Sequence, residues 1–258
     1  MMATTAIQAR FQPIVGLQTG RVVGFEALAR PAPDRRGQGT TPPDGWLTDG
    51  GLAAEMLEQA AAAIPRWRQL PGHGDLFVHV NVTSDDLEQP DLPDRITELR
   101  ARHRLPRGVI QIEITEQLPI ANMAETVKRL LALKGAGVGL VLDDFGSGYS
   151  SLAWLHDLPA DGLKIDGDLT AKLGSERGNV ILAATVQLGH ALGLCVTAEG
   201  VEDVGKTAQL RAIGVDQVQG FGFGRPMRAE DVAPFLERGG AETGEPPASQ
   251  PPSAGDRP

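Results

Sequence analysis

Short apolar runs alternate along the chain with segments in which apolar residues recur at helical spacing. The runs are rich in Val, Ile and Leu, which is typical of buried strands, and the periodic segments predict amphipathic helices. The helical pattern is clearest at 92–105, 123–134 and 178–192. The apolar runs lie at 76–81, 109–114, 138–142, 162–165 and 195–198. Repeated strand-then-helix units predict a mainly parallel α/β sheet, either open or closed into a barrel.

Polar side chains stand at or just past the C-terminal ends of these apolar runs. They are Asn81, Glu113, Asp143, Lys164 and Glu199. In a parallel barrel the C-terminal ends of the strands converge on one face, which is where active sites lie. A single carboxylate at such a place could be a helix cap. Several carboxylates packed together repel one another unless cations hold them, so we expect a cation site at this face.

Two adjacent carboxylates, Asp143 and Asp144, follow one of the runs and precede a glycine-serine loop. Ordinary turn chemistry would also explain an Asp that is followed by Gly and Ser. The Asp-Phe-Gly triplet of protein kinases requires an upstream His-Arg-Asp loop, and the chain offers only His-Arg-Leu at 103–105. A phosphate-binding P-loop is excluded because no Gly-Lys-Ser/Thr closes the loop. Other parts of the sequence are therefore needed to distinguish an ordinary turn from a pair of cation-binding carboxylates.

Charge narrows the classes of partner. The formal net charge of the 258 residues is −9, which disfavours a broad contact with large nucleic acids, whereas a site for divalent cations tolerates that sign. A local basic cluster is better explained by the favourable interaction of cations with a helix C-terminus than by a nucleic-acid patch. The cluster consists of Arg100, Arg102, His103, Arg104 and Arg107.

Length and hydropathy favour a soluble globular protein. The chain fits either one large α/β domain or two small ones. Its first residues lack the apolar core of a signal peptide. The longest apolar region, 180–196, is interrupted by Gln187 and His190 and is too short to span a bilayer. We therefore predict a cytoplasmic protein that does not bind a membrane.

Two further features have ordinary structural explanations. Cys195 lies in the apolar stretch 192–196, where a small buried residue is favoured over a reactive thiol. Residues 239–258 are rich in Gly, Pro and Ser and have almost no apolar side chain to bury. That composition predicts a disordered tail.

Several short motifs occur in a fixed order over about residues 10–236. The set consists of Glu26-Ala27-Leu28 within FQPIVGLQTGRVVGFEALAR, VNV around Asn81, IEITE at 112–116, DDFGSGYSSL from Asp143, LKID around Lys164, AEGVE around Glu199, and DQVQGFGFGRP around Gln219. Any one motif is weak, but the ordered set resembles the EAL domains, a family that degrades the bacterial second messenger cyclic di-GMP. The resemblance implies a modified (β/α)₈ TIM-type barrel whose first strand runs antiparallel to the rest. It also implies a short lead at 1–9, an EAL domain at 10–238 and the tail at 239–258.

The resemblance implies a two-metal site. In the first set of ligands, Glu26, Asn81, Glu113 and Asp143 would hold one divalent ion. In the second set, Asp143, Asp144 and Glu199 would hold another, so Asp143 would bridge the two. An all-oxygen ligand set suits Mg²⁺ or Mn²⁺. Two such ions can deprotonate a water molecule and neutralise the phosphodiester, and the implied reaction is hydrolysis of cyclic di-GMP to linear pGpG.

The resemblance also implies roles for residues around the metals. Lys164 would orient the attacking water and offset developing charge, although a lysine paired with an acid inside the barrel is the alternative. Glu199 and Gln219 match catalytic positions of the family. Glu116 matches a glutamate that steadies the loop after the paired aspartates, and that loop with its following helix implies a homodimer contact.

The substrate contacts implied by the resemblance lie in the first part of the chain. Gln12, Leu28 and Arg30 match positions that contact the nucleotide, and the forked guanidinium of Arg30 suits a phosphate. The segment 31–51 then departs from the family pattern. Every implied metal position and Lys164 are nevertheless present, which favours an active phosphodiesterase. The alternatives are a non-catalytic cyclic di-GMP receptor and an interaction scaffold, the latter supported by the divergent segment alone.

Overall fold

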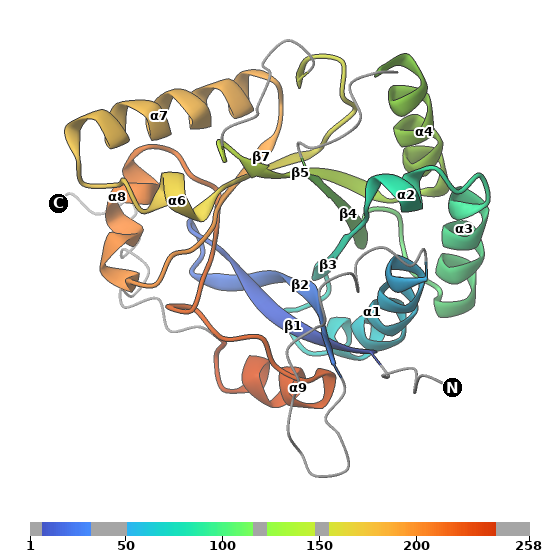
Figure 1. Cartoon of the computed structure of the whole chain (residues 1–258). Coiled ribbons are helices and arrows are strands. Elements are labelled where there is room, and N and C mark those ends of the chain that lie inside the picture. The colour runs from blue at the N-terminus through green and yellow to red at the C-terminus, as the bar shows by residue number, and fades with distance from the viewer. Residues whose placement is uncertain (1–6, 32–50, 116–122, 148–154, 241–258) are drawn as a thin grey trace, which may run out of the picture.

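Eight strands close into a barrel that is surrounded by helices (Figure 1). The computed structural model describes residues 7–31, 51–115, 123–147 and 155–240. Neighbouring strands follow the order of the chain, and the last strand closes onto the first. The strands are β1 (Ile7–Gly16), β2 (Arg21–Pro31), β3 (Phe77–Asn81), β4 (Ile110–Thr115), β5 (Gly139–Phe145), β6 (Gly162–Ile165), β7 (Cys195–Ala198) and β8 (Gln217–Gln219).

The direction of the first strand distinguishes this barrel from one that is parallel throughout. β1 forms a hairpin with β2 and runs antiparallel to both β2 and β8. The pairs from β2–β3 to β7–β8 are parallel. The predicted modified (β/α)₈ barrel is therefore confirmed, including its antiparallel first strand. The C-terminal ends of β2 to β8 consequently meet at one edge, here called the barrel mouth.

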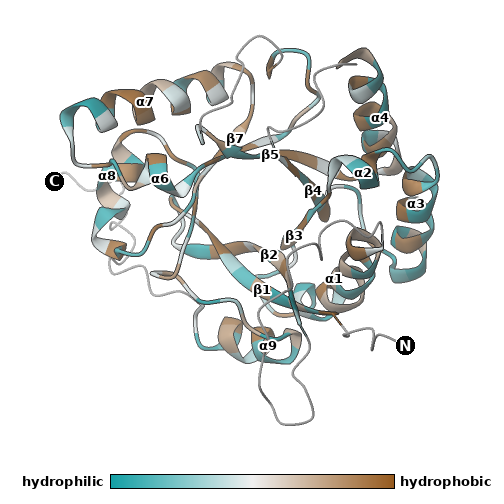
Figure 2. Ribbon diagram, viewed as in Figure 1, coloured by the Kyte–Doolittle hydropathy of each residue, from teal (hydrophilic) through white to brown (hydrophobic). Residues whose placement is uncertain are grey.

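Helices that carry both hydrophobic and hydrophilic residues cover the outside of the barrel (Figure 2). They are α1 (Leu52–Arg68), α2 (Ser84–Leu87), α3 (Leu92–His103), α4 (Met123–Ala136), α6 (Gly167–Thr170), α7 (Glu176–Ala191), η3 (Val204–Lys206), α8 (Thr207–Ala212) and α9 (Ala229–Glu237). Within the described ranges, every helix is too short or too polar to cross a lipid bilayer.

Alternation along the strands separates the apolar shell from a polar interior. Successive side chains of a strand point to opposite faces. On β7, Val196 faces α7, since a side chain added at Gly189 of that helix would meet Val196. The next residue, Thr197, is also buried but donates a hydrogen bond to Gln217 of β8, 3.2 Å away. On β7, the residue that faces the helices is thus aliphatic, and the residue that faces the barrel interior is polar.

The basic cluster stabilises helix packing. Arg100 and Arg107 donate hydrogen bonds to the last carbonyl groups of α4, those of residues 134–136. Arg102 pairs with Glu58 of α1 at 2.8 Å. Cations near a helix C-terminus are stabilising. Arg100, Arg102 and His103 lie in the last turn of α3, and Arg100 and Arg107 reach the end of α4 as well, because packing brings the two helix ends together.

Cys195 begins β7 and is half-buried. Its burial and the neighbouring Asp216 raise the pKa of the thiol to about 11. A thiol with such a pKa stays protonated near neutral pH and is a poor nucleophile. The environment of Cys195 therefore supports the structural explanation given to it from the sequence.

Some sequence predictions concern residues outside the described ranges. Glu116, the loop at 148–154, most of the divergent segment at 32–50 and the predicted tail from 241 onward belong to them.

Candidate active site

The buried ammonium group of Lys164 lies at the centre of the barrel mouth. Its side chain, on β6, is 1% exposed. Lys164 Nζ lies within ion-pair distance of four carboxylates, which come from β2, β4, β5 and the residue after β7. They are Glu113 Oε1 at 2.6 Å, Glu199 Oε1 at 2.7 Å, Asp143 Oδ1 at 3.1 Å and Glu26 Oε2 at 3.4 Å. The strand-end residues expected to converge do so, and an internal cation partly offsets their mutual repulsion.

Amide side chains hold Glu26 from two sides. Asn81 Nδ2 donates to Glu26 Oε1 at 2.9 Å, and Gln219 Nε2 donates to Glu26 Oε2 at 2.6 Å. Gln219 Nε2 also lies 3.4 Å from Gln12 Oε1, on β1. Since β1 pairs with both β2 and β8, the antiparallel strand brings Gln12 between Glu26 and Gln219.

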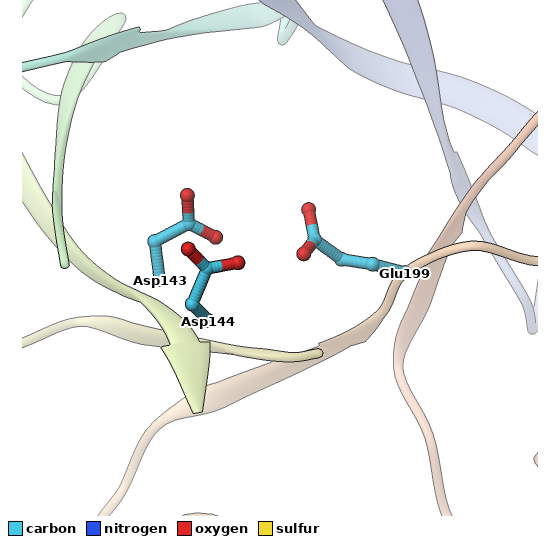
Figure 3. Close-up of side chains that lie close together, drawn as sticks. All are labelled: Asp143, Asp144 and Glu199. Carbon is cyan, nitrogen blue, oxygen red and sulfur yellow. The ribbon is translucent and has the colours of Figure 1, made fainter. Parts of the chain in front are cut away.

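Asp143, Asp144 and Glu199 form the compact carboxylate cluster of the mouth. One oxygen of each residue lies within 4.8 Å of the others, a spacing that could hold a metal ion. Figure 3 shows the two aspartates turned toward Glu199. In a regular strand, adjacent residues such as Asp143 and Asp144 would point to opposite faces. Their convergence therefore requires a departure from regular strand geometry.

A β-bulge supplies that departure. In the pairing of β5 with β6, Leu142 pairs with Leu163 but Phe145 pairs with Ile165, so β5 contains one extra residue. Asp144 within the bulge has a φ of 58°, in the left-handed region that non-glycine residues rarely adopt. Bulges redirect side chains and occur near active sites. The strained backbone at Asp144 thus turns the second carboxylate into the mouth.

Sequence reasoning missed His79, a buried residue on β3. Its Nδ1 lies 2.7 Å from Glu113 Oε1, and its ring is stacked on that of Phe77. Burial and the charge of Lys164 lower the pKa of His79 to about 3. The imidazole is therefore neutral, and the contact is a hydrogen bond to the carboxylate and not an ion pair. Its position two residues before Asn81, on the same face of the strand, was the signal that could have identified it.

The protonation equilibria of the mouth reflect burial and mutual charge. Burial alone would raise the pKa of Glu26, but Lys164 and the hydrogen bonds from Gln219 and Asn81 reverse the effect and leave this pKa below its usual value. Burial, with Glu26 nearby, raises the pKa of Glu113 well above the ordinary range. Burial likewise raises the pKa of Glu199 to about 8 against the opposing effect of Lys164.

Lys164 itself stays charged. Burial would lower the pKa of its ammonium group, but Glu113, Glu26 and the other carboxylates around it raise this pKa well above the ordinary lysine value. The lysine therefore brings a permanent positive charge to the mouth, in keeping with either of the roles considered for it from the sequence.

A cavity of about 290 Å³ opens beside the carboxylates. Gln12, Glu26, Glu199, Gln219 and Phe221 are among its lining residues. The cavity thus joins three of the predicted metal or catalytic residues to one predicted substrate contact. A ligand that enters it would lie against the charged edge of the barrel.

Two predicted substrate contacts lie farther along β2. Leu28 is partly buried, and Arg30 is exposed with its guanidinium turned back to the carbonyl oxygen of Ala29, 2.8 Å away. Neither is among the residues that line the cavity. The structure therefore brings Gln12 to the mouth but does not bring Arg30 to it.

The donor set fits divalent cations. The ligand atoms of both predicted sets are oxygens, which suits Mg²⁺ or Mn²⁺. Glu113 Oε2 is buried and has no hydrogen-bond partner among the described residues. Asp143 Oδ1 makes an ion pair with Lys164 but no hydrogen bond within the same part of the chain. Buried polar atoms are normally paired, so these oxygens have coordination capacity left.

Comparison with known proteins gives a consistent result. The model of the EAL domain family matches residues 2–226. An uncharacterized protein of Azorhizobium caulinodans is 35% identical over 250 residues, which are 93% of this chain and 34% of that protein. MucR of Pseudomonas aeruginosa, a bifunctional diguanylate cyclase/cyclic di-GMP phosphodiesterase, is 33% identical over 236 residues, 86% of this chain and 33% of MucR. The chain thus spans about a third of the length of these two relatives.

Solved structures with the same fold contain the nucleotide. The complex of the MucR phosphodiesterase with cyclic di-GMP has a TM-score of 0.78 and 32% identity, and the match covers 88% of this chain and 94% of that one. A manganese/cyclic di-GMP complex of BlrP1 from Klebsiella pneumoniae has a TM-score of 0.74 and 29% identity, and the match covers 88% of this chain and 57% of that one.

Proposed function

The chain belongs to the EAL domain family, and we propose that it hydrolyses cyclic di-GMP to linear pGpG at the barrel mouth. The observation that carries the proposal is the convergence of Asp143, Asp144 and Glu199 beside the buried ammonium of Lys164. Carboxylate oxygens at this spacing suit a divalent ion, whose charge would offset their mutual repulsion.

The charge of the mouth supports a metal-dependent reaction. Cyclic di-GMP carries two phosphodiester anions, and carboxylates would repel them in the absence of further cations. Glu26, Asn81, Glu113 and Asp143 would hold one ion, and Asp143, Asp144 and Glu199 a second. When bound, two Mg²⁺ or Mn²⁺ ions would activate a water molecule and neutralise the phosphodiester during in-line attack. Asn81 already donates to Glu26 through its amide nitrogen, so its oxygen would be the ligand atom.

Lys164 would act on the reacting atoms. Its ammonium is fixed by ion pairs to residues of both ligand sets, so it would need no reorganisation when negative charge develops on the phosphoryl oxygens. Preorganised donors of this kind stabilise the transition state more than they stabilise the bound substrate, so they lower the activation barrier. The water that attacks would be oriented by the same group.

Residues around the metals would bind and position the nucleotide. Gln12 and Gln219 line the cavity beside Glu26, and Gln219 would keep this carboxylate oriented through its 2.6 Å hydrogen bond. Leu28 and Arg30 would contact the nucleotide once Arg30 turns away from the backbone carbonyl. Glu116 would steady the loop after the paired aspartates. A homodimer and a cytoplasmic location stay predictions from the sequence.

A turnover assay tests the proposal. The purified chain should convert cyclic di-GMP to pGpG in Mg²⁺ or Mn²⁺, with the product resolved by chromatography, and should lose activity with a chelator. Glu199→Gln should be inactive, whereas the matched change Glu98→Gln, on the exposed face of α3, should leave turnover unchanged. If the wild-type protein binds the nucleotide but does not cleave it with either ion, it is a receptor. If it binds none, a scaffold function takes first place.

A further inference from the structure

His79 is a buried polar side chain for which the proposed reaction has no role. It is 2% exposed and lies on the inward face of β3, between Phe77 and Asn81. Its ring stacks on Phe77, with the ring centroids 4.8 Å apart and the planes 23° from parallel. Gly24 makes room for Phe77, because a side chain at that position would lie 2.3 Å from the aromatic ring. The stacking on Phe77 therefore restricts the orientation of the His79 imidazole.

The stacked ring of His79 contacts only one of the two carboxylate oxygens of Glu113, Oε1. Glu113 Oε1 lies 2.7 Å from His79 Nδ1 and 2.6 Å from Lys164 Nζ. Glu113 Oε2 is buried without a hydrogen-bond partner among the described residues. A buried carboxylate oxygen without a partner is costly. The two contacts thus fix the rotation of the carboxylate, and within the described part of the chain the second oxygen has no hydrogen-bond partner.

We propose that His79 is a positioning residue: its Nδ1–H holds Glu113 Oε1, so that Glu113 Oε2 is presented to a divalent cation of the first ligand set. The inference rests on the proposed function, because it takes Glu113 as a ligand. Groups that hydrogen-bond to a ligating carboxylate orient it, and their loss typically weakens metal binding about 10–100-fold.

The experiment measures binding of Mn²⁺ alone, without nucleotide, to chelator-treated protein, by electron paramagnetic resonance of the free ion. In His79→Leu, which removes the donor, the dissociation constant of the tighter ion should rise roughly 10–100-fold. In His79→Asn, whose amide nitrogen can take the place of Nδ1, most of the affinity should remain. In His79→Gln the donor lies one bond too far, so the loss should resemble that of the leucine variant.

Thr197→Val is the matched control. Thr197 also lies inside the barrel two residues before a predicted ligand, Glu199, but its hydroxyl bonds to Gln217 and not to a carboxylate. This variant should bind Mn²⁺ like the wild type. An unchanged affinity in His79→Leu, or an equal loss in Thr197→Val, would overturn the inference. If His79→Leu does not fold, the comparison of His79→Asn with His79→Gln decides, and equal affinities in these two variants would also overturn it.

Turnover separates this inference from the proposed function. If wild-type protein binds Mn²⁺ and never cleaves cyclic di-GMP, while His79→Leu binds Mn²⁺ more weakly, the proposed function fails and the positioning role stands. If wild-type protein is active and His79→Leu keeps its Mn²⁺ affinity, the positioning role fails alone. Absence of Mn²⁺ binding by the wild type would overturn both. In an active protein, His79→Leu should raise the Mn²⁺ concentration needed for half-maximal rate and leave the KM for nucleotide at saturating metal nearly unchanged.

Discussion

The two halves of the carboxylate site are built by different means. In the half formed by Glu26, Asn81 and Glu113, strand pairing sets the geometry: Glu26 pairs with His79, and Asn81 with Glu113. The half formed by Asp144 and Glu199 depends on departures from pairing, namely the bulge of β5 and the residue that follows β7. Glu26 and Glu113 of the first half are buried, whereas its Asn81 is exposed, and both residues of the second half are partly exposed.

The two halves should differ in how easily their geometry changes. Backbone hydrogen bonds and amide donors hold the first half, so its shape resists change. The second half is held by a strained residue and by side chains at the barrel edge, so its geometry is easier to alter. Lys164 joins the two halves, because its ammonium contacts Glu113 of the first and Glu199 of the second. Substitutions in the two halves should therefore have different signatures.

Loss of a ligand in the rigid half should have the largest effect. Glu26→Ala removes a predicted ligand and the acceptor of two amide hydrogen bonds, and we expect turnover of cyclic di-GMP to fall below detection. The barrel should still fold, because the side chain stands at the mouth and not under a helix. Steady-state assays and circular dichroism measure the two properties. Near-normal activity would contradict the assignment of Glu26 as a ligand.

Removal of the shared cation should affect both halves. Lys164→Met leaves four carboxylates without their counter-charge, so the metal-free protein should lose roughly 3–5 kcal/mol of unfolding free energy. With metal, kcat should fall roughly 10²–10³-fold while the affinity for cyclic di-GMP is kept. Urea unfolding with and without Mn²⁺ checks the first effect, and added Mn²⁺ should restore part of the stability. A stability loss that Mn²⁺ does not reduce would argue against a cation site here.

Asp144→Asn should weaken the second ion selectively. The amide keeps the shape of the side chain and tolerates the left-handed φ, but it loses the charge. We expect the metal concentration for half-maximal rate to rise about tenfold, equal to about 1.4 kcal/mol of binding free energy. Titration of the rate with Mn²⁺ measures the shift. The same titration of His79→Leu should report on the other half, so a double variant that shows additive shifts would indicate two separate ions.

The fold and much of the site were predictable, and the failures have a common cause. The strands β3 to β7 follow from apolar runs, and the clustering of Glu113, Asp143, Lys164 and Glu199 follows from their places at strand ends. No apolar run was identified at β1, β2 or β8, and the antiparallel first strand was expected only through the family resemblance. The pattern of apolar and polar residues shows the neighbours of a residue along the chain, but it does not show which residues it contacts on other strands.

His79 and Asp144 illustrate that limit. The contact of His79 with Glu113 is diagonal between strands, since the direct partner of His79 on β4 is Gln111. The direction of Asp144 depends on a bulge that exists only once β5 pairs with β6. The basic cluster adds a further case: Arg100 and Arg107 also donate hydrogen bonds to the end of α4, because tertiary packing brings the helix ends together. Each case depends on register or packing, which a single sequence pattern does not contain.

The stability of the metal-free protein should depend on pH through Glu199, which belongs to the half formed with Asp144. The pKa of Glu199 is raised by burial to about 8 in the folded state, above its ordinary value of 4.5. Between these two values the folded chain binds more protons than the unfolded chain, so this group makes stability fall as pH rises from 4.5 through 8. The melting temperature of chelated protein should decline more steeply over that range in the wild type than in Glu199→Gln. Equal slopes would show that Glu199 titrates normally.

The smallest expected effect tests the strain at Asp144. Its φ of 58° is free of cost for glycine but disfavours a residue with a Cβ, by roughly 1–2 kcal/mol for alanine and less for aspartate, whose side chain can bond locally. Asp144→Gly should therefore be about 1 kcal/mol more stable than Asp144→Ala, although both lose the carboxylate and both should need more Mn²⁺. Urea unfolding of the two metal-free variants gives the difference. Because both variants remove the same charge, relief of repulsion at the mouth cancels between them and only the backbone term remains. Equal stabilities would mean that β5 adopts a regular pairing once the aspartate is gone, and the bulge would then be maintained by the side chain of Asp144 and not by the backbone around it.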